Sequence, residues 1–227
     1  MPKAACNLYD CFLCQHCIIE WRALIGLNKE TRLIRKGKAV FKEGDPVEGI
    51  YFVYQGWVKI HKEWTHPKEL ILRFAGAGDI IGHRGLGDKR NYPVSATAIE
   101  DSTVCYVTED FLESCLRANP GLTYRLMQFY AAELQKAEKR MRDLVHMETK
   151  GRIAGALQEI TDKFGRNSEG YISVPVSRQD IASYAGTTYE TLFKVLNDMK
   201  KGKIISTSGK FIKIKSEKKL HELLIMK

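Results

Sequence analysis

The segment between Gly121 and Gly151, which contains neither proline nor glycine, constrains the fold more than any other part of the chain. Apolar residues recur along it in steps of three or four, on one face of a helix: Leu126, Tyr130, Leu134, Ala137, Met141 and Leu144. So long a helix is unusual within one globular domain, and its apolar stripe predicts a coiled-coil seam between two copies of the chain. The alternative is a helix that packs this stripe on its own neighbouring domain.

Short segments of strand character precede this helix, within residues 30–115. Residues 38–42, 50–54, 57–61 and 70–74 are rich in β-branched and aromatic residues. Turn signals separate them, at Glu43-Gly-Asp-Pro, Gln55-Gly and Ala75-Gly-Ala-Gly-Asp. Because these spacings leave no room for crossover helices, the pattern predicts an antiparallel barrel or sandwich.

The residues after Gly151 are helical in pattern. One helix runs to Gly165 and places four apolar residues on one face: Ile153, Ala156, Leu157 and Ile160. After an extended piece at residues 171–176, Ser177 begins a capping box in which Asp180 replaces the usual glutamate. The second helix therefore starts at Ser177, and Ala185-Gly186 ends it.

A third helix follows this break directly. Thr187 or Thr188 caps it, and Glu190 is placed to complete a capping box from Thr187. Its inward residues recur at helical spacing: Leu192, Val195, Leu196 and Met199. Gly202 ends this helix, and residues 204–206 and 211–214 then predict a β-hairpin. The C-terminal layout is that of a winged helix-turn-helix.

Charge is distributed unevenly along the chain. Residues 150–227 hold 15 Lys and Arg against 8 Asp and Glu, a net charge of +7 out of the +9 of the whole chain. A cationic domain beside a nearly neutral one favours a polyanion partner, because neutralised phosphates release counterions. The alternative is a basic surface that serves only solubility.

The predicted fold class is therefore α+β, in four parts. A cysteine-rich segment spans residues 1–29, an all-β domain residues 30–118, a dimerisation helix residues 119–149 and a winged helix-turn-helix residues 150–227. No stretch is apolar and long enough for a membrane helix, and the N-terminus lacks the apolar run of a signal peptide. We expect a cytoplasmic protein.

Residues 177–196 carry a resemblance to a known family. They run Ser-Arg-Gln-Asp-Ile-Ala-Ser-Tyr-Ala-Gly-Thr-Thr-Tyr-Glu-Thr-Leu-Phe-Lys-Val-Leu and resemble the helix-turn-helix of the Crp/Fnr superfamily of transcription regulators. Gly37, Gly44, Gly56 and the run Gly78-Asp-Ile-Ile-Gly82 match the turn glycines of its cyclic-nucleotide-binding-type barrel, a jelly roll. The resemblance extends from residue 33 to residue 214. It implies a homodimeric sensor whose partners are a double-stranded DNA operator and RNA polymerase.

The resemblance also assigns residues to DNA contacts. The family's base-reading positions correspond to Tyr189, Glu190 and Lys194, after the capping Thr188. A carboxylate accepts from cytosine N4, and a long cation one turn later donates to guanine. Many relatives have arginine where this chain has Lys194, which cannot form the planar bidentate contact, so we expect a different operator.

Flanking residues complete this predicted interface. Phe193 lies near the same outward face, where it contacts a thymine methyl or covers the apolar edge of the helix. Ser177, Arg178 and Gln179 match family positions that hold phosphate. The alternative for these three residues is a solvated helix end.

At the positions of the family's effector pocket, this chain departs from the family pattern. Its cyclic AMP site has a glutamate after the glycine turn and an Arg-Ser pair further on, whereas this chain has Gly82-His83 and Val94-Ser95. Without that guanidinium a buried cyclic phosphate lacks its charge partner, so cyclic AMP is disfavoured. Arg84 or Arg90 could hold another anion, or be solvated loop cations.

Cysteines crowd the N-terminus. Cys11-x2-Cys14-x2-Cys17 is a spacing that iron–sulfur clusters use, and Cys105 matches the distant fourth ligand of the fumarate–nitrate regulators. An oxygen-responsive [4Fe-4S] cluster is one hypothesis, although those regulators have a longer gap before the third N-terminal ligand. Zinc, with His16 as a ligand, and unligated thiols are the alternatives. Cys115 is expected in the core.

Two other function classes compete with a DNA-binding regulator. One is a ligand- or redox-sensing signalling module whose C-terminal domain binds protein instead of DNA. Its binding would depend little on salt, whereas phosphate contacts weaken steeply as salt rises. An enzyme is not expected, because the sequence contains no nucleophile–base pair, phosphate-cradling glycine loop or metal-hydrolase spacing.

Overall fold

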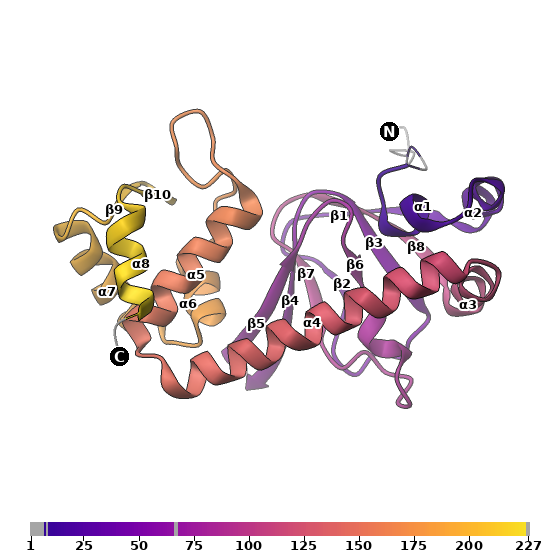
Figure 1. The fold of residues 1–227 in the computed structure, drawn as a ribbon, viewed down its shortest axis with the longest axis horizontal. Helices are drawn as coiled ribbons and strands as arrows, with labels where there is room; N and C mark the ends of the chain where they lie inside the picture. The colour runs from indigo at the N-terminus through magenta and orange to yellow at the C-terminus, as the bar shows by residue number, and fades with distance from the viewer. Residues whose placement is uncertain (1–6, 8, 66–67, 226–227) are drawn as a thin grey trace. The chain divides into compact units, whose positions relative to one another are not determined.

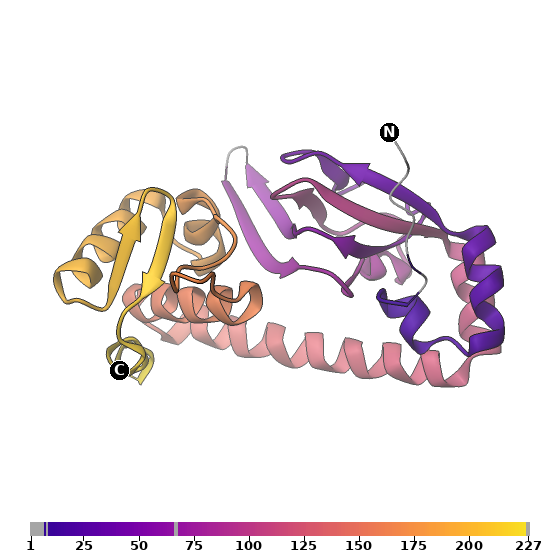
Figure 2. The same cartoon turned by 90° about the horizontal axis from the view of Figure 1, so that it is seen from above.

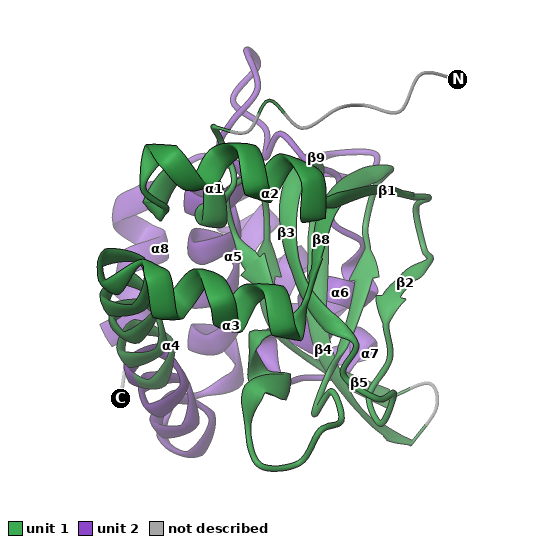
Figure 3. Ribbon diagram, turned by 90° about the vertical axis from the view of Figure 1, so that its right-hand side faces the viewer, with its two compact units in different colours: residues 1–134 green, residues 135–227 purple. Residues whose placement is uncertain are grey.

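The computed structural model describes residues 7, 9–65 and 68–225 (Figure 1). They form two compact units, residues 1–134 and residues 135–227 (Figure 3). The boundary falls within the long helix α4 (Pro120–His146), so the last turns of this helix belong to unit 2. Across the described ranges, no helix has both the length and the apolar character needed to span a membrane.

Unit 1 contains two antiparallel sheets of four strands each. Their orders are β1-β8-β3-β6 and β2-β7-β4-β5, and this pairing confirms the predicted antiparallel sandwich. Figure 2 shows the strands of unit 1 in indigo to magenta. The strands are β1 (Glu30–Ile34), β2 (Ala39–Phe41), β3 (Gly49–Gln55), β4 (Val58–Thr65), β5 (Lys68–Ala75), β6 (Ile80–Ile81), β7 (Ser95–Ala98) and β8 (Ser102–Thr108). Gly56 turns the chain between β3 and β4 with φ +88°, and a Cβ there would lie 2.8 Å from the Ser102 Cα, so this turn requires glycine.

Aromatic rings fill the space between the two sheets. Phe41 stacks on Tyr92 with ring centroids 4.1 Å apart and on Tyr51 at 5.6 Å, and Tyr51 lies 5.1 Å from Tyr106. The Tyr92 hydroxyl donates to the Gly49 carbonyl oxygen at 2.6 Å, so its one polar group is satisfied. The sandwich interior is thus a packed core to which several elements each contribute one aromatic ring.

Helices cover one end of the sandwich and form a second core. They are α1 (Phe12–His16), the 3-10 helices η1 (Ile19–Trp21) and η2 (His83–Leu86), α2 (Arg22–Asn28), α3 (Glu109–Ala118) and the first turns of α4. Leu13, Ile25 and Leu122 from these helices are buried against Ile50 and Phe52 of β3. The sequence patterns did not predict α1 or α2, because each is too short to show a helical repeat.

The stripe on α4 needs correction at both of its ends. Tyr130, Leu134, Ala137 and Met141 are exposed in the single chain, and Leu134 and Met141 are 60% and 58% exposed. Leu126, however, is only 6% exposed and belongs to the core of unit 1. Leu144 is half-buried because it packs on the turn at Gly186. The neighbouring residues Met127 and Val145 are the exposed ones, so the free stripe is rotated slightly at each end.

Unit 2 holds the C-terminal helices and a hairpin. Its elements are α5 (Thr149–Phe164), α6 (Arg178–Ala185), α7 (Tyr189–Lys201), β9 (Ile205–Ser208), β10 (Phe211–Ile214) and α8 (Glu217–Ile225). Helix α5 packs against α6 and α8, and α7 contacts the β9–β10 hairpin. The predicted winged helix-turn-helix is confirmed, while α8 is an addition that the sequence patterns did not predict.

Candidate functional site

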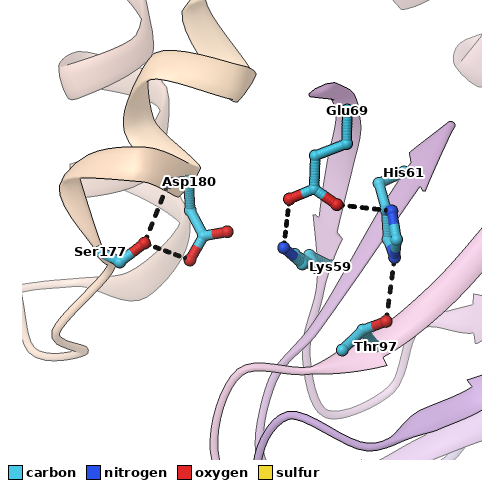
Figure 4. Close-up of polar contacts among 6 residues, drawn as sticks. All are labelled: Lys59, His61, Glu69, Thr97, Ser177 and Asp180. Atoms are coloured by element: carbon cyan, nitrogen blue, oxygen red, sulfur yellow. Dashed lines mark hydrogen bonds and ion pairs between the residues drawn. The ribbon is translucent and has the colours of Figure 1, made fainter. Parts of the chain in front are cut away.

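The first helix of the helix-turn-helix, α6, is fixed at both ends. The Ser177 Oγ accepts from the Asp180 backbone N–H at 2.9 Å and donates to the Asp180 carboxylate at 2.7 Å (Figure 4). The predicted start of the helix at Ser177 is confirmed, although the Asp180 carboxylate accepts from the Ser177 hydroxyl, whereas a full capping box has it accept from the Ser177 backbone N–H. Gly186 ends the helix in the left-handed conformation at φ +62°, which a glycine adopts without strain.

The second helix, α7, begins at Tyr189 after a threonine cap. Thr188 is that cap, and its Oγ1 accepts from the Thr191 backbone N–H at 3.2 Å. The predicted box from Thr187 to Glu190 is wrong, because Thr187 belongs to the turn, where its N–H donates to the Ala182 carbonyl oxygen at 3.0 Å. Hydrogen bonds from its own backbone N–H and from the Thr188 side chain hold the pKa of Glu190 below its usual value. Glu190 is thus a fixed anion at the start of α7.

Helix α7 separates its side chains by face. Leu192, Leu196 and Met199 are buried inward. Tyr189 and Phe193 are 43% and 55% exposed, with their rings parallel at a centroid distance of 6.5 Å. The polar residues of the same outward row, Glu190 and Lys194, are exposed as well. The structure thus leaves the three predicted base-reading side chains exposed on one face of α7, together with Phe193.

The three predicted phosphate contacts differ in their availability. Ser177 and Gln179 are exposed, but the Ser177 hydroxyl caps α6 and donates to the Asp180 carboxylate. Arg178 is half-buried, and its Nη1 has no hydrogen-bond partner among the described residues. Burial lowers the pKa of the Arg178 guanidinium, and Tyr189 opposes that shift. An arginine that loses solvent without gaining a full set of partners is suited to receive an anion.

Comparisons with known proteins match both units. The family model of the cyclic nucleotide-binding domain covers residues 31–119, and that of the Crp-like helix-turn-helix domain covers residues 151–223. The anaerobic regulatory protein of Bacillus subtilis is 30% identical over 186 residues, 80% of this chain and 78% of that protein. The chain belongs to the Crp/Fnr family.

Other relatives of this Crp/Fnr regulator agree over almost its whole length. The fumarate and nitrate reduction regulatory protein of Yersinia pestis is 27% identical over 227 residues, 96% of this chain and 90% of that protein. The structure of FixK2 from Bradyrhizobium japonicum superimposes with a TM-score of 0.77 at 28% identity, covering 88% of this chain and 98% of that one. The chain is a DNA-binding transcription regulator of Crp/Fnr type, and the relatives from Bacillus subtilis and Yersinia pestis are both regulatory proteins.

The effector candidates of this Crp/Fnr regulator fall into two groups. Val94 lies in the aromatic core of the sandwich, and the Ser95 Oγ accepts from the Glu43 backbone N–H at 2.9 Å. Gly82, with φ +82°, leads into η2 and places His83 against α4. The His83 ring lies 4.9 Å from the Phe129 ring, and its backbone oxygen accepts from the Tyr130 hydroxyl at 2.5 Å.

His83 sits among cations. Its side chain is 3% exposed, and both ring nitrogens lack a hydrogen-bond partner among the described residues. Burial above all, and then Arg73 and Arg84, lowers the pKa of His83 to about 3, so the imidazole is neutral. Arg84 is no solvated loop cation, because it faces Glu133 of α4 at 3.7 Å, while Arg73 faces the same carboxylate at 3.3 Å. The Glu133 carboxylate on α4 thus pairs with the guanidinium groups of both Arg73 and Arg84.

The second loop cation, Arg90, has a different partner. Its Nη1 lies 3.2 Å from the Glu109 carboxylate, and its side chain is 77% exposed. An ion pair so open to solvent adds little stability and holds no buried anion.

The N-terminal cysteines converge in one core with two later ones. Cys11, Cys14, Cys17, Cys105 and Cys115 are each at most 7% exposed and belong to the same cluster. The Cys11 and Cys14 Sγ atoms lie 3.3 Å apart, and the Cys115 thiol raises the pKa of Cys17 through a hydrogen bond, with burial adding to it. The prediction that Cys115 lies in the core is confirmed.

A cation accompanies the first two thiols. The Lys29 Nζ lies 3.1 Å from the Cys14 Sγ and 3.9 Å from the Cys11 Sγ. Soft sulfur donors buried in an apolar core beside an ammonium group suit an anionic iron–sulfur cluster in chemistry and location. Their present separations do not form a ligand set, since no three Cys, His, Asp or Glu side chains in the described part of the chain could hold one metal ion. His16, the candidate zinc ligand, packs its ring on Phe12 at 4.8 Å.

The second sheet holds a half-buried polar cluster that the sequence patterns did not predict. The Glu69 carboxylate of β5 forms an ion pair with Lys59 and meets the His61 Nδ1 at 2.7 Å, both from β4 (Figure 4). The His61 Nε2 lies 2.9 Å from the Thr97 Oγ1 of β7. Burial alone would raise the pKa of Glu69, but hydrogen bonds from His61 and Lys59 outweigh it and bring the pKa to about 2.

The low pKa of Glu69 predicts how the free energy of unfolding depends on pH. The stabilisation by ionised Glu69 is fully present above the ordinary value of 4.5 and is lost as pH falls towards about 2. Glu69→Gln is expected to lower the free energy of unfolding at neutral pH by about 1 to 2 kcal/mol and to flatten its fall with acid. Denaturant unfolding at a series of pH values measures both effects. Glu63→Gln, on the exposed residue opposite in the same hairpin, is the control, and equal acid sensitivity of the two variants would contradict the prediction.

Proposed function

We propose that this regulator reads a two-fold symmetric operator as a homodimer, with α7 of each protomer in the major groove. The observation that carries the proposal is the exposed row of Tyr189, Glu190, Phe193 and Lys194 on a helix fixed by Thr188. Symmetric protomers of this kind address half-sites one helical turn apart. In this assignment the cysteine-rich residues 1–29 and the sandwich of residues 30–118 together sense the signal, residues 119–149 dimerise and residues 150–227 bind DNA. The partners are duplex DNA, a second copy of the chain and RNA polymerase, in the cytoplasm.

Sequence preference would come from two polar side chains. The Glu190 carboxylate accepts from a cytosine N4 amino group, and the Lys194 ammonium donates to guanine O6 or N7 on a neighbouring pair. The stacked rings of Tyr189 and Phe193 present apolar edges to thymine methyl groups, which agrees with their exposure. The exposed Phe193 favours base contact over the alternative of covering the edge of its own helix.

Phosphate contacts would orient this row on the duplex. Arg178 and Gln179 stand at the start of α6, where backbone N–H groups and the helix dipole also favour an anion. The Arg178 Nη1, without a partner in the described structure, is available for a phosphate oxygen. Ser177 would contribute through its backbone, since its hydroxyl caps α6.

The dimer would form along the free stripe of α4. Met127, Tyr130, Leu134, Ala137, Met141 and Val145 follow one another in steps of three or four and are all exposed. An exposed apolar row of this length on one helix marks an association surface. Two such helices side by side give a coiled coil that sets the distance between the two copies of α7.

The signal would arise at the N-terminal cysteines. Cys11, Cys14, Cys17 and Cys105 would hold the [4Fe-4S] cluster, which when bound supplies a centre sensitive to oxygen. This segment touches the long helix directly, because Phe12 packs on Phe129 of α4 with ring centroids 5.9 Å apart. Cyclic AMP as the effector is disfavoured by the neutral His83 and by the stacked rings that fill the sandwich.

A second contact ties the cysteine segment to the start of α4. The Ile18 backbone N–H donates to the Asn119 Oδ1 at 2.9 Å, and the Asn119 Nδ2 donates to the Cys115 carbonyl oxygen at 2.7 Å. Asn119 is buried and directly precedes α4. A rearrangement of Cys17 would therefore reach the base of the dimerisation helix through one buried side chain.

The proposal is tested by selecting duplexes from a random-sequence library with protein purified without oxygen. The wild type is expected to enrich a two-fold symmetric sequence, and Glu190→Ala to lose the preference at one position of each half-site while keeping nonspecific binding. A good carboxylate–cytosine contact discriminates by about 1 to 3 kcal/mol, or about five- to 150-fold. Glu217→Ala, an exposed carboxylate on α8, is the control. Preferences identical to the wild type in both variants would refute the role of Glu190, and no enriched sequence at all would refute the proposed function.

A further inference from the structure

The last turns of α4 pack on the first helix of the helix-turn-helix and belong to unit 2. The Arg140 guanidinium lies over the Tyr184 ring, 4.3 Å from its centroid, and donates to the Tyr184 backbone oxygen. The Tyr184 hydroxyl donates in turn to the Glu159 carboxylate of α5 at 2.6 Å. Tyr184 is thereby clamped from α4 and from α5.

The contacts of Arg140 lie at the C-terminal end of α6. Tyr184, Ala185 and Gly186 stand at the C-terminal end of α6, where carbonyl groups have no partner within the helix. Arg140 supplies a donor to the first of them, and Arg152 of α5 supplies donors to the other two at 3.2 and 3.4 Å. Two guanidinium groups at a helix C-terminus also interact favourably with the negative end of the helix dipole. The turn of the helix-turn-helix is therefore held by side chains from outside the motif.

Close packing reinforces this hold on the turn. A Cβ on Gly186 would lie 2.6 Å from the Leu144 Cδ2, which leaves no room for a side chain between α4 and the turn. Leu144 stands one helical turn after Arg140, so both residues face α6 from the same side of α4. The dimerisation helix thus contacts the end of α6 and the turn that follows it through two residues, Arg140 and Leu144.

We infer that Arg140 is a positioning residue for DNA recognition: it joins the end of the dimerisation helix to the turn that sets the direction of α7. The inference rests on the proposed function, because it assumes that α7 reads bases. Arg140 itself points at α6 and touches no base. Without Arg140, the turn and α7 can adopt several orientations. The base contacts of α7 are then weakened, while the electrostatic attraction to the phosphate backbone is retained.

The chain offers a closely matched control in Arg142. This residue lies on the same turn of α4, its side chain is 64% exposed and it pairs with the adjacent Asp143 at 2.6 Å. Arg140→Ala and Arg142→Ala remove the same charge and the same side chain, so their effects on nonspecific electrostatic attraction are equal. Any difference in specific binding then reports the contact to the turn.

The experiment compares binding of the two variants to the selected operator and to a scrambled duplex. Arg140→Ala is expected to bind the operator about tenfold more weakly than Arg142→Ala, as for the loss of a hydrogen bond from a charged donor. Both are expected to bind the scrambled duplex equally and to keep the same dimer mass in sedimentation. Hydrogen exchange within residues 180–190 should be faster in Arg140→Ala alone.

The outcomes separate this inference from the proposed function. Equal operator affinity of the two alanine variants overturns the role of Arg140, even when the wild type selects a clear operator. If Arg140→Ala does not fold at the assay temperature, Arg140→Lys carries the same comparison. The lysine keeps the charge but not the planar group that stacks and donates at once, so about threefold weaker operator binding than Arg142→Ala is expected. An unchanged affinity of the lysine variant in that case also overturns the inference.

Discussion

Leu134→Glu is expected to convert the dimer into monomers at concentrations where the wild type is fully dimeric. Leu134 lies in the middle of the free stripe of α4 and is 60% exposed in the single chain. In a symmetric coiled coil the new carboxylate meets its own copy across the seam, in a place that excludes water. Burying charges without partners costs about 3 to 5 kcal/mol, so the dimer dissociation constant should rise at least about 100-fold. Sedimentation velocity over a concentration series measures this shift.

Loss of the dimer should also weaken operator binding. Two linked half-site contacts gain about 100- to 10,000-fold over one, because the second contact becomes intramolecular. Gln135→Glu introduces the same charge at the next, exposed position and should leave both mass and affinity unchanged. A Leu134→Glu protein that remains dimeric would show that the stripe on α4 is not the seam and that another surface joins the protomers.

The sequence was most informative where local chemistry decides the structure. Ser177 with Asp180, the break at Gly186 and the inward residues Leu192 and Leu196 were sufficient to place both helices of the motif. Each signal acts within one or two turns of helix, so neighbouring residues alone specify it. The same holds for the turn glycines of the sandwich. The likeness of residues 177–196 to a known motif then supplied the function.

The sequence was least informative where packing over long distances decides. Leu126 and Met127 are both apolar, and only the core beneath α4 determines which one is buried. The pairing of Glu133 with Arg73 crosses much of the chain and leaves no local pattern. The contact of Arg140 with the turn after Tyr184 is hidden for the same reason. These are the contacts that couple one element to another.

Helix α8 is a different case, because its signal was present. Ser216 accepts from the Lys219 backbone N–H at 3.3 Å, as a capping serine does, and Leu220 and Leu223 are buried at helical spacing. The short α1 and α2 carry no such repeat. Their apolar residues gain burial only from the sheet that they cover, so tertiary packing and not helix propensity forms them.

Cys105→Ala is expected to abolish cluster binding, whereas Cys115→Ala is expected to retain it. Both thiols are fully buried in the same core, so each substitution removes one sulfur atom from an equivalent environment. A [4Fe-4S] cluster takes four thiolates, and in the proposed set Cys105 supplies the fourth, with Cys11, Cys14 and Cys17. Iron content should therefore fall from about four atoms per protomer to near zero in Cys105→Ala only. Iron and sulfide analysis of protein purified without oxygen, with its visible absorption spectrum, measures this difference.

The pair of variants decides between the open alternatives for the thiols. A colourless, iron-free wild type would remove the cluster, and zinc in that protein would favour the alternative ligand set with His16. Retention of iron in Cys105→Ala with loss in Cys115→Ala would make Cys115 the distant ligand, as its contact with Cys17 allows. The Lys29 ammonium, 3.1 Å from the Cys14 Sγ, adds an independent check. Because the ammonium group offsets negative charge at the sulfurs, Lys29→Met should reduce iron retention even though no ligand is lost. Unchanged iron retention in Lys29→Met would indicate that the metal binds elsewhere.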